Sequence, residues 1–220
     1  MFRPKYITFD CYGTIINFAM GPTAREVFAD RVSAEEMDAF VESFRGYRLD
    51  EVLGAWKPFY DVVANAVART CKKHGVTCTK EDFDVFYNAI PTWQPHSDAP
   101  GPLARVAEKI PLVILSNSMI DLIPHSVKNI GVPFHAALTA EEAQCYKPRM
   151  GAFEFMFDKL GCGPEDIMHV SSSPRYDLMT AYDLGIATKV MVTRGHEPKV
   201  DGYDLNFIKD FSELPGLVGL

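Results

Sequence analysis

Short apolar runs recur at wide spacing along the chain, and helical patterns lie between the later ones. An apolar run of about four to eight residues is typical of a strand that is buried on both faces, as in a parallel sheet. Such runs span residues 5–10, 111–117, 166–172 and 188–193, with a weaker one at 206–211. Helical patterns cover 119–129, 151–160 and 176–184. This alternation predicts a Rossmann-like, doubly wound α/β core: a parallel sheet with helices on both faces.

The long stretch after the first apolar run differs from the rest, because it contains helical patterns and no convincing strand. The patterns span residues 33–53, 57–75 and 81–93. Ser33 and Glu36 are spaced as in a capping box, and Gly75 suits the end of the second helix. We therefore expect a small all-helical cap at residues 16–97, inserted into a core made of residues 1–15 and 98–220.

Composition narrows the classes of partner. The 220 residues carry a formal net charge of −7, and 47% of them are hydrophobic. Nucleic acids and membrane surfaces do not attract an acidic protein, so neither is expected as a partner, whereas a small anionic substrate can still bind in a local cationic pocket. No apolar run approaches the ~18 residues of a membrane span.

The cysteine and histidine patterns bear on compartment and metals. The five cysteines are scattered without a C-x-x-C pair, and the N-terminus has no signal-peptide pattern. These features indicate reduced thiols in the cytoplasm. The six histidines are scattered as well, with no zinc-binding spacing. We expect neither a metal nor a cofactor.

Polar side chains stand at the carboxyl ends of the predicted strands, where open parallel sheets bind their ligands. Asp10 ends the first strand, Ser116 and Asn117 end the second, and Asp177 follows a run of serines at the end of the third. Lys147 lies between the second and third strands. Each has an ordinary explanation, as a helix cap, a first-turn acid or a solvated lysine. Their recurrence at successive strand ends predicts one site.

Four motifs occur in order: FDCYGT at 9–14, LSNS at 115–118, YKP at 146–148 and SSSPRYD at 171–177. Together they resemble the haloacid dehalogenase superfamily, whose small cap matches the helical insert, so the resemblance covers the whole chain. Most members are magnesium-dependent phosphatases with D-x-D in the first motif and G-D-x-x-x-x-D in the last. Here Tyr12 and Ser172 stand in place of two of those acids, which leaves a poor magnesium site and no phosphatase general acid.

The D-x-Y-G-T pattern is similar to that of the metal-independent (S)-2-haloacid dehalogenases. This resemblance implies that the Asp10 carboxylate displaces halide from the α-carbon and forms an aspartyl ester. Water then hydrolyses the ester to a hydroxyacid of inverted configuration. Lys147 would keep Asp10 ionised and oriented, Thr14 would donate a hydrogen bond to it, and Asp177 would activate the water.

The resemblance also implies a place for the substrate. The candidates for binding its carboxylate are Ser116 and the backbone N–H groups of Cys11 and Tyr12. Asn117 is a candidate for the halide. Arg45 best matches the arginine that closes over the halogen in the family, and Arg48, one turn away, is the alternative. Phe59 could form an apolar wall. Alone, the arginines would be interpreted as a solvated helix face and Phe59 as cap core.

Three departures from the dehalogenase pattern bear on the second half-reaction, which is hydrolysis of the ester, and on the identity of the substrate. Ser173 stands where asparagine is usual, with one residue more before Asp177. Phe153 replaces a tyrosine, and Ser118 stands where the family usually has a small residue. We expect Ser171 or Ser173 to hold the hydrolytic water in place of the asparagine.

Three alternative functions remain. A related hydrolase could displace at carbon in a fluorinated acid or a strained ring. A small-molecule phosphatase would need the acids that Tyr12 and Ser172 replace. A binding protein with a decayed site would have no need to keep Asp10, Lys147 and Asp177 together. The resemblance also implies a homodimer.

Overall fold

A computed structural model describes residues 2–220, and these form two compact units. The core unit contains the residues up to Asn17 together with Gln94–Leu220, and the helical unit is Phe18–Trp93. The sequence assigned 16–97 to the helical unit. In the structure, Ile16 forms an isolated β-bridge with Pro95, and the Asn17 N–H donates to the Gln94 carbonyl. These pairings tie both connections to the core.

The core unit is built on a six-stranded sheet in which every neighbouring pair of strands is parallel. The strand order is β3-β2-β1-β4-β5-β6. The strands are β1 (Tyr6–Phe9), β2 (Leu112–Ser116), β3 (Ala136–Thr139), β4 (Ile167–Ser171), β5 (Thr188–Val192) and β6 (Leu205–Ile208). The predicted parallel α/β core is confirmed. β1 lies between β2 and β4, so the loops after these three strands share one edge of the sheet.

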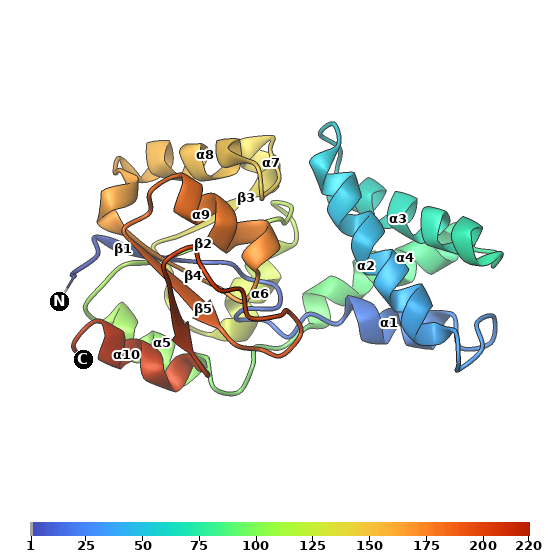
Figure 1. Cartoon of the computed structure of the whole chain (residues 1–220), viewed down its shortest axis with the longest axis horizontal. Coiled ribbons are helices and arrows are strands. Elements are labelled where there is room, and N and C mark those ends of the chain that lie inside the picture. Colours follow the sequence, from blue (N-terminus) through green and yellow to red (C-terminus); the bar gives the residue numbers. More distant parts are fainter. Residues whose placement is uncertain (1) are drawn as a thin grey trace. The chain divides into compact units, whose positions relative to one another are not determined.

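Helices cover both faces of this sheet. They are α5 (Pro100–Ala107), α6 (Ile123–Ile130), α7 (Ala140–Ala143), α8 (Met150–Leu160), α9 (Met179–Asp183) and α10 (Leu214–Leu217), with short turns η2 (Pro164–Asp166), η3 (Pro174–Leu178) and η4 (Phe211–Glu213). Helices α8 and α9 lie on one face, and α5 and α10 lie on the other (Figure 1). Gly131 and Gly161 end α6 and α8 in the left-handed region, with φ of 69° and 57°, as their positions in the sequence predict.

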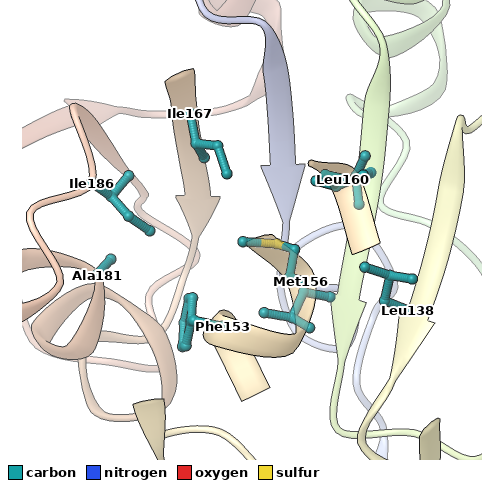
Figure 2. Close-up of a cluster of buried hydrophobic side chains, with 9 residues drawn as sticks. Leu138, Phe153, Met156, Leu160, Ile167, Ala181 and Ile186 are labelled. Carbon is teal, nitrogen blue, oxygen red and sulfur yellow. The ribbon is translucent and has the colours of Figure 1, made fainter. Parts of the chain in front are cut away.

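A hydrophobic cluster fills the space between the sheet and helices α8 and α9. It consists of Val113, Leu115, Leu138, Phe153, Met156, Leu160, Ile167, Ala181 and Ile186. Figure 2 shows side chains from the strands and from α8 meeting in this layer. The cluster fixes α8 against β2 and β4, and the functional candidates follow directly from the ends of those strands.

Met156→Ala is expected to lower the free energy of unfolding by about 2–5 kcal/mol, because it removes a fully buried side chain and leaves a cavity. Chemical denaturation measures the change. Met150→Ala removes the same atoms from the first turn of the same helix, where the side chain is 43% exposed, and should cost far less. Equal losses in the two variants would contradict the central position of Met156 in the core.

The helical unit has its own core. It contains α1 (Met20–Val27), α2 (Met37–Leu53), α3 (Phe59–His74), α4 (Lys80–Ala89) and the turn η1 (Ile90–Thr92). Four buried phenylalanines pack at its centre, with ring centroids 4.9 Å apart for Phe28 and Phe40 and 5.1 Å apart for Phe44 and Phe86. The three predicted helices are present, and Gly75 ends α3 with φ of 66°. Helix α2 begins later than predicted, after a turn in which the Ser33 carbonyl accepts from Glu36 and Met37.

None of the helices formed by residues 2–220 combines the length and the apolar character needed to cross a bilayer.

Candidate active site

Asp10 follows β1 directly and is held between neighbouring strands. Its backbone N–H donates to the Val170 carbonyl at 3.1 Å, which continues the pairing of β1 with β4. The side chain is 11% exposed. Its Oδ2 accepts from the Thr14 hydroxyl at 2.7 Å, and its Oδ1 accepts from Lys147 Nζ at 3.0 Å. Gly13, with φ of 92°, makes the turn that brings Thr14 back toward Asp10.

Lys147 is buried, and each hydrogen of its ammonium group has an acceptor. Nζ donates to Asp10 Oδ1 at 3.0 Å, to Asp177 Oδ1 at 2.7 Å and to the Leu115 carbonyl at 2.8 Å. The Asn117 side chain fixes the lysine backbone, because its amide donates to the Lys147 carbonyl at 2.9 Å and its oxygen accepts from the Lys147 N–H at 2.8 Å. Lys147 is therefore a fixed cation between two carboxylates.

Asp177 is fully buried in the π-helical turn η3 that follows β4. Its Oδ1 accepts from Lys147 and lies 3.0 Å from His169 Nε2. The other ring nitrogen of His169, Nδ1, is 2.7 Å from the Thr8 hydroxyl. Asp177 Oδ2 is buried and has no hydrogen-bond partner among the described residues. No hydrogen bond within the described residues uses the lone pairs of this oxygen.

The two carboxylates differ in acidity. Burial raises the pKa of Asp10 above its ordinary value, the negative charge of Asp177 adds to this, and Lys147 offsets only part. Burial also acts to raise the pKa of Asp177, but Lys147 and the hydrogen bond from His169 outweigh it, so this pKa is lowered. For Lys147, burial is outweighed by the two aspartates, so its pKa is raised. Lys147 lowers the pKa of Asp10, the direction expected from the sequence, but burial and Asp177 together raise it by more.

The serine run after β4 shapes the loop that carries Asp177. The Ser171 hydroxyl accepts from the Ser173 N–H at 3.0 Å, and the Ser173 hydroxyl accepts from the Tyr176 N–H at 3.2 Å, which caps η3. Ser172 joins this loop to the first one, because its N–H donates to the Thr14 hydroxyl at 2.9 Å. In this structure Ser171 and Ser173 bond to backbone groups of their own loop.

The proposed carboxylate-binding groups lie at the same sheet edge. Ser116 ends β2, and its buried hydroxyl has no hydrogen-bond partner within residues 2–220. Tyr12 reaches α6, where its hydroxyl accepts from Ser126 at 3.1 Å and lies 3.3 Å from the Ser118 hydroxyl. The Cys11 thiol is buried, and burial raises its pKa. Cys11 is therefore a neutral thiol, and its contribution to binding would come from the backbone.

Arg45, Arg48 and Phe59 belong to the helical unit. Arg45 Nη1 lies 3.5 Å from Glu42 Oε2, one turn earlier on α2. The Arg48 guanidinium lies over the rings of Phe18 and Phe44, at 4.9 and 4.8 Å from their centroids. Phe59 begins α3 and is 8% exposed. The contacts of these three residues described here are all within the helical unit.

The donor set in the core does not fit Mg²⁺, which prefers carboxylates and water in an octahedral arrangement. Asp10 and Asp177 already share the Lys147 ammonium. The Ser172 hydroxyl donates to the Gly13 carbonyl at 3.0 Å. Within the part of the chain that the structure describes, no three histidine, cysteine or acidic side chains gather as a metal ion requires.

His169 is one of two residues at this site that were not predicted from the sequence. A histidine inside an apolar strand is more often a satisfied core residue. The sequence carried no direct signal for it, because Thr8 on β1 meets His169 on β4 only through the parallel register of the two strands. Arg194 was not predicted either. Its Nε and Nη2 donate to the Thr14 carbonyl at 3.2 and 3.0 Å, and these hydrogen bonds stabilise the loop that follows β1.

The known proteins that this chain resembles in sequence include several dehalogenases. The haloacetate dehalogenase H-2 of Moraxella sp. (strain B) is 28% identical over 126 residues, which is 56% of this chain and 56% of that protein. The (S)-2-haloacid dehalogenase of Xanthobacter autotrophicus is 24% identical over 190 residues, 83% of this chain and 73% of the relative. The chain thus spans little more than half the length of the first relative.

A solved structure agrees over nearly the whole chain. The L-2-haloacid dehalogenase from Xanthobacter autotrophicus with chloropropionic acid covalently bound superposes with a TM-score of 0.80, at 21% identity and over 98% of each chain. This likeness establishes the fold. The family model for haloacid dehalogenase-like hydrolases matches residues 4–185, which include all four motifs of the core. The chain is a member of the haloacid dehalogenase-like hydrolase family.

Proposed function

We propose that this hydrolase converts (S)-2-haloacids to (R)-2-hydroxyacids through an ester on Asp10, without a metal. One observation carries the proposal: a buried carboxylate held by Thr14 and Lys147 stands beside a second buried carboxylate that has one unbonded oxygen. The names of the relatives support the substrate class.

In the first step, an Asp10 carboxylate oxygen attacks the α-carbon from the side opposite the halogen. A carbon–oxygen bond forms, the carbon–halogen bond breaks, and halide leaves with the electron pair. No proton is needed for this departure, so an acid at the position of Tyr12 would serve no purpose. Because Asp10 must be ionised and burial raises its pKa, the rate of this step should fall as the pH drops through that pKa.

In the second step, Asp177 Oδ2 takes a proton from water, and the hydroxide attacks the ester carbonyl carbon of Asp10. The bond from this carbon to the hydroxyacid oxygen breaks, and the departing oxygen receives the proton from Asp177. Asp10 is left as a carboxylic acid that contains the oxygen and the second hydrogen of the water, and loss of this proton to solvent restores the carboxylate. The configuration set by the first step is kept.

The net charge of the Asp10, Lys147 and Asp177 cluster determines which groups are needed to bind an anionic substrate. Two ionised aspartates and one lysine leave the cluster with an excess of one negative charge, which repels a haloacid carboxylate. The Ser116 hydroxyl and the backbone N–H groups of Cys11 and Tyr12 can bind this carboxylate without adding charge. An arginine of the helical unit, with Arg45 the preferred candidate and Arg48 the alternative, would balance the excess and stabilise the departing halide.

The test is halide release by the purified protein from (S)-2-chloropropionate in the presence of EDTA. We expect steady release that Asp10→Asn lowers by about a thousandfold or more, because the amide cannot act as the nucleophile. The (R)-enantiomer should react far more slowly. Small phosphate esters with magnesium are offered in parallel. Phosphate release from these, without halide release from haloacids, would overturn the proposal.

A further inference from the structure

His169 and Thr8 form a polar pair inside an otherwise apolar layer. They are register partners on the neighbouring strands β4 and β1, and both side chains are fully buried. The His169 ring packs edge to face against Phe153 of α8, with centroids 5.4 Å apart. A polar ring at this depth is costly unless its nitrogens are bonded, and both of them are.

The partner at Nε2 determines which ring nitrogen must act as a donor. Asp177 Oδ1 only accepts, so Nε2 must carry a hydrogen. The Thr8 hydroxyl can serve Nδ1 as donor or acceptor, so it holds the ring without competing for the Nε2 hydrogen. The charged groups facing this end of the ring are Asp177 and, beyond it, Lys147, with Asp10 on the far side of the lysine.

We propose that His169 is a positioning residue for ester hydrolysis: held by Thr8, it donates to Asp177 Oδ1 and leaves Oδ2 as the proton-accepting atom. The inference rests on the proposed function and assigns a further residue to the second half-reaction. Lys147 also donates to Oδ1, but it serves Asp10 as well, and the charge of Asp10 disappears when the ester forms. The bond from His169 is the same before and after that change.

This separation of roles predicts an effect on one half-reaction only. The groups that hold the nucleophile Asp10 are Thr14 and Lys147, whereas the hydrogen bonds of His169 go to Thr8 and Asp177. Loss of the His169 donor should therefore leave halide displacement almost unchanged and slow hydrolysis of the ester. It should also move the acid limb of the kcat–pH profile upward, because a donor that lowers the pKa of Asp177 is gone.

The test compares the two half-reactions in His169→Phe, which keeps an aromatic ring and removes the donor. We expect a rate of halide release in the first turnover within about twofold of the wild type, and ester hydrolysis slowed about tenfold to a hundredfold. The ester should accumulate and appear as a mass increase on the peptide containing Asp10. His169→Gln, whose amide N–H can replace the Nε2 donor, should recover most of the loss.

A matched variant separates positioning from folding. Met156→Ala weakens the same hydrophobic layer without removing a hydrogen bond, so it should lower stability and leave the ratio of the two rates unchanged. Equal slowing of both steps in His169→Phe, or no recovery in His169→Gln, would overturn the role of His169 while halide release by the wild type still stands. Absence of halide release by the wild type would overturn the proposed function itself.

Nitrogen-15 NMR of the histidine rings supplies a readout that needs no substrate. Nε2 of His169 should carry a proton in the wild type, and Thr8→Val should change the signal of Nδ1. A proton on Nδ1 alone in the wild type would overturn the inference whatever the kinetics.

Discussion

Lys147→Met is expected to lower kcat/KM for halide release by about a hundredfold to a thousandfold at neutral pH. The lysine ammonium is bonded to both Asp10 and Asp177, and methionine leaves these two buried carboxylates facing each other without a cation. One of them must then take up a proton, and Asp10, whose pKa is already raised by burial, is the one that does. A protonated Asp10 is not a nucleophile.

The pH dependence identifies the cause of this loss. Activity of Lys147→Met should recover in part as the pH rises and Asp10 ionises, whereas a misfolded site would stay inactive at every pH. Removing one partner of a buried ion pair should also cost about 3–5 kcal/mol of stability. Lys128→Met, at an exposed position of α6, is the matched control and should change neither quantity. Activity within about tenfold of the wild type would contradict the assignment of Lys147.

Asp177→Asn is expected to stop the reaction after one turnover. The asparagine oxygen can accept from Lys147 and His169 as Oδ1 does, but its amide nitrogen cannot take a proton where Oδ2 stands. One equivalent of halide should be released, and steady turnover should fall by about a thousandfold. Mass spectrometry should find the substrate's carbon skeleton attached to Asp10.

Asp183→Asn, at an exposed position at the end of α9, makes the same chemical change outside the site. It should turn over normally and show no adduct. Normal turnover by Asp177→Asn would mean that another group activates the water, and failure to release even one equivalent of halide would place Asp177 in the first step as well.

The sheet followed from the sequence wherever a strand was an apolar run bounded by turn residues. The unpredicted strand, β3, is Ala-Ala-Leu-Thr, in which two small residues give little hydrophobic signal. It is a strand because Val113 to Ser116 of β2 offer it a register. Helix α1 was also unpredicted, since Met20–Val27 contains both glycine and proline near its start. These elements depend on their neighbours more than on their own residues.

The candidate site was predictable to the extent that it follows strand ends. Asp10, Lys147 and Asp177 converge because parallel strands deliver their carboxyl ends to one edge. The network behind them was not predictable, because Thr8 and His169 meet only through the pairing of β1 with β4. The net direction of the Asp10 pKa shift could not be predicted from the sequence either, since it depends on burial and on the nearby Asp177 carboxylate.

The place of β1 in the sheet has a consequence for the order in which the chain folds. Ile7 pairs with Leu112 on one side and with Met168 on the other. During synthesis, β1 and then the whole contiguous helical unit, Phe18–Trp93, therefore leave the ribosome before either partner strand of β1 exists. Contacts that are distant in sequence form slowly. Until these contacts form, β1 remains an unpaired apolar segment, which favours aggregation. The site around Asp10, which follows β1, forms only after β4 has been synthesised.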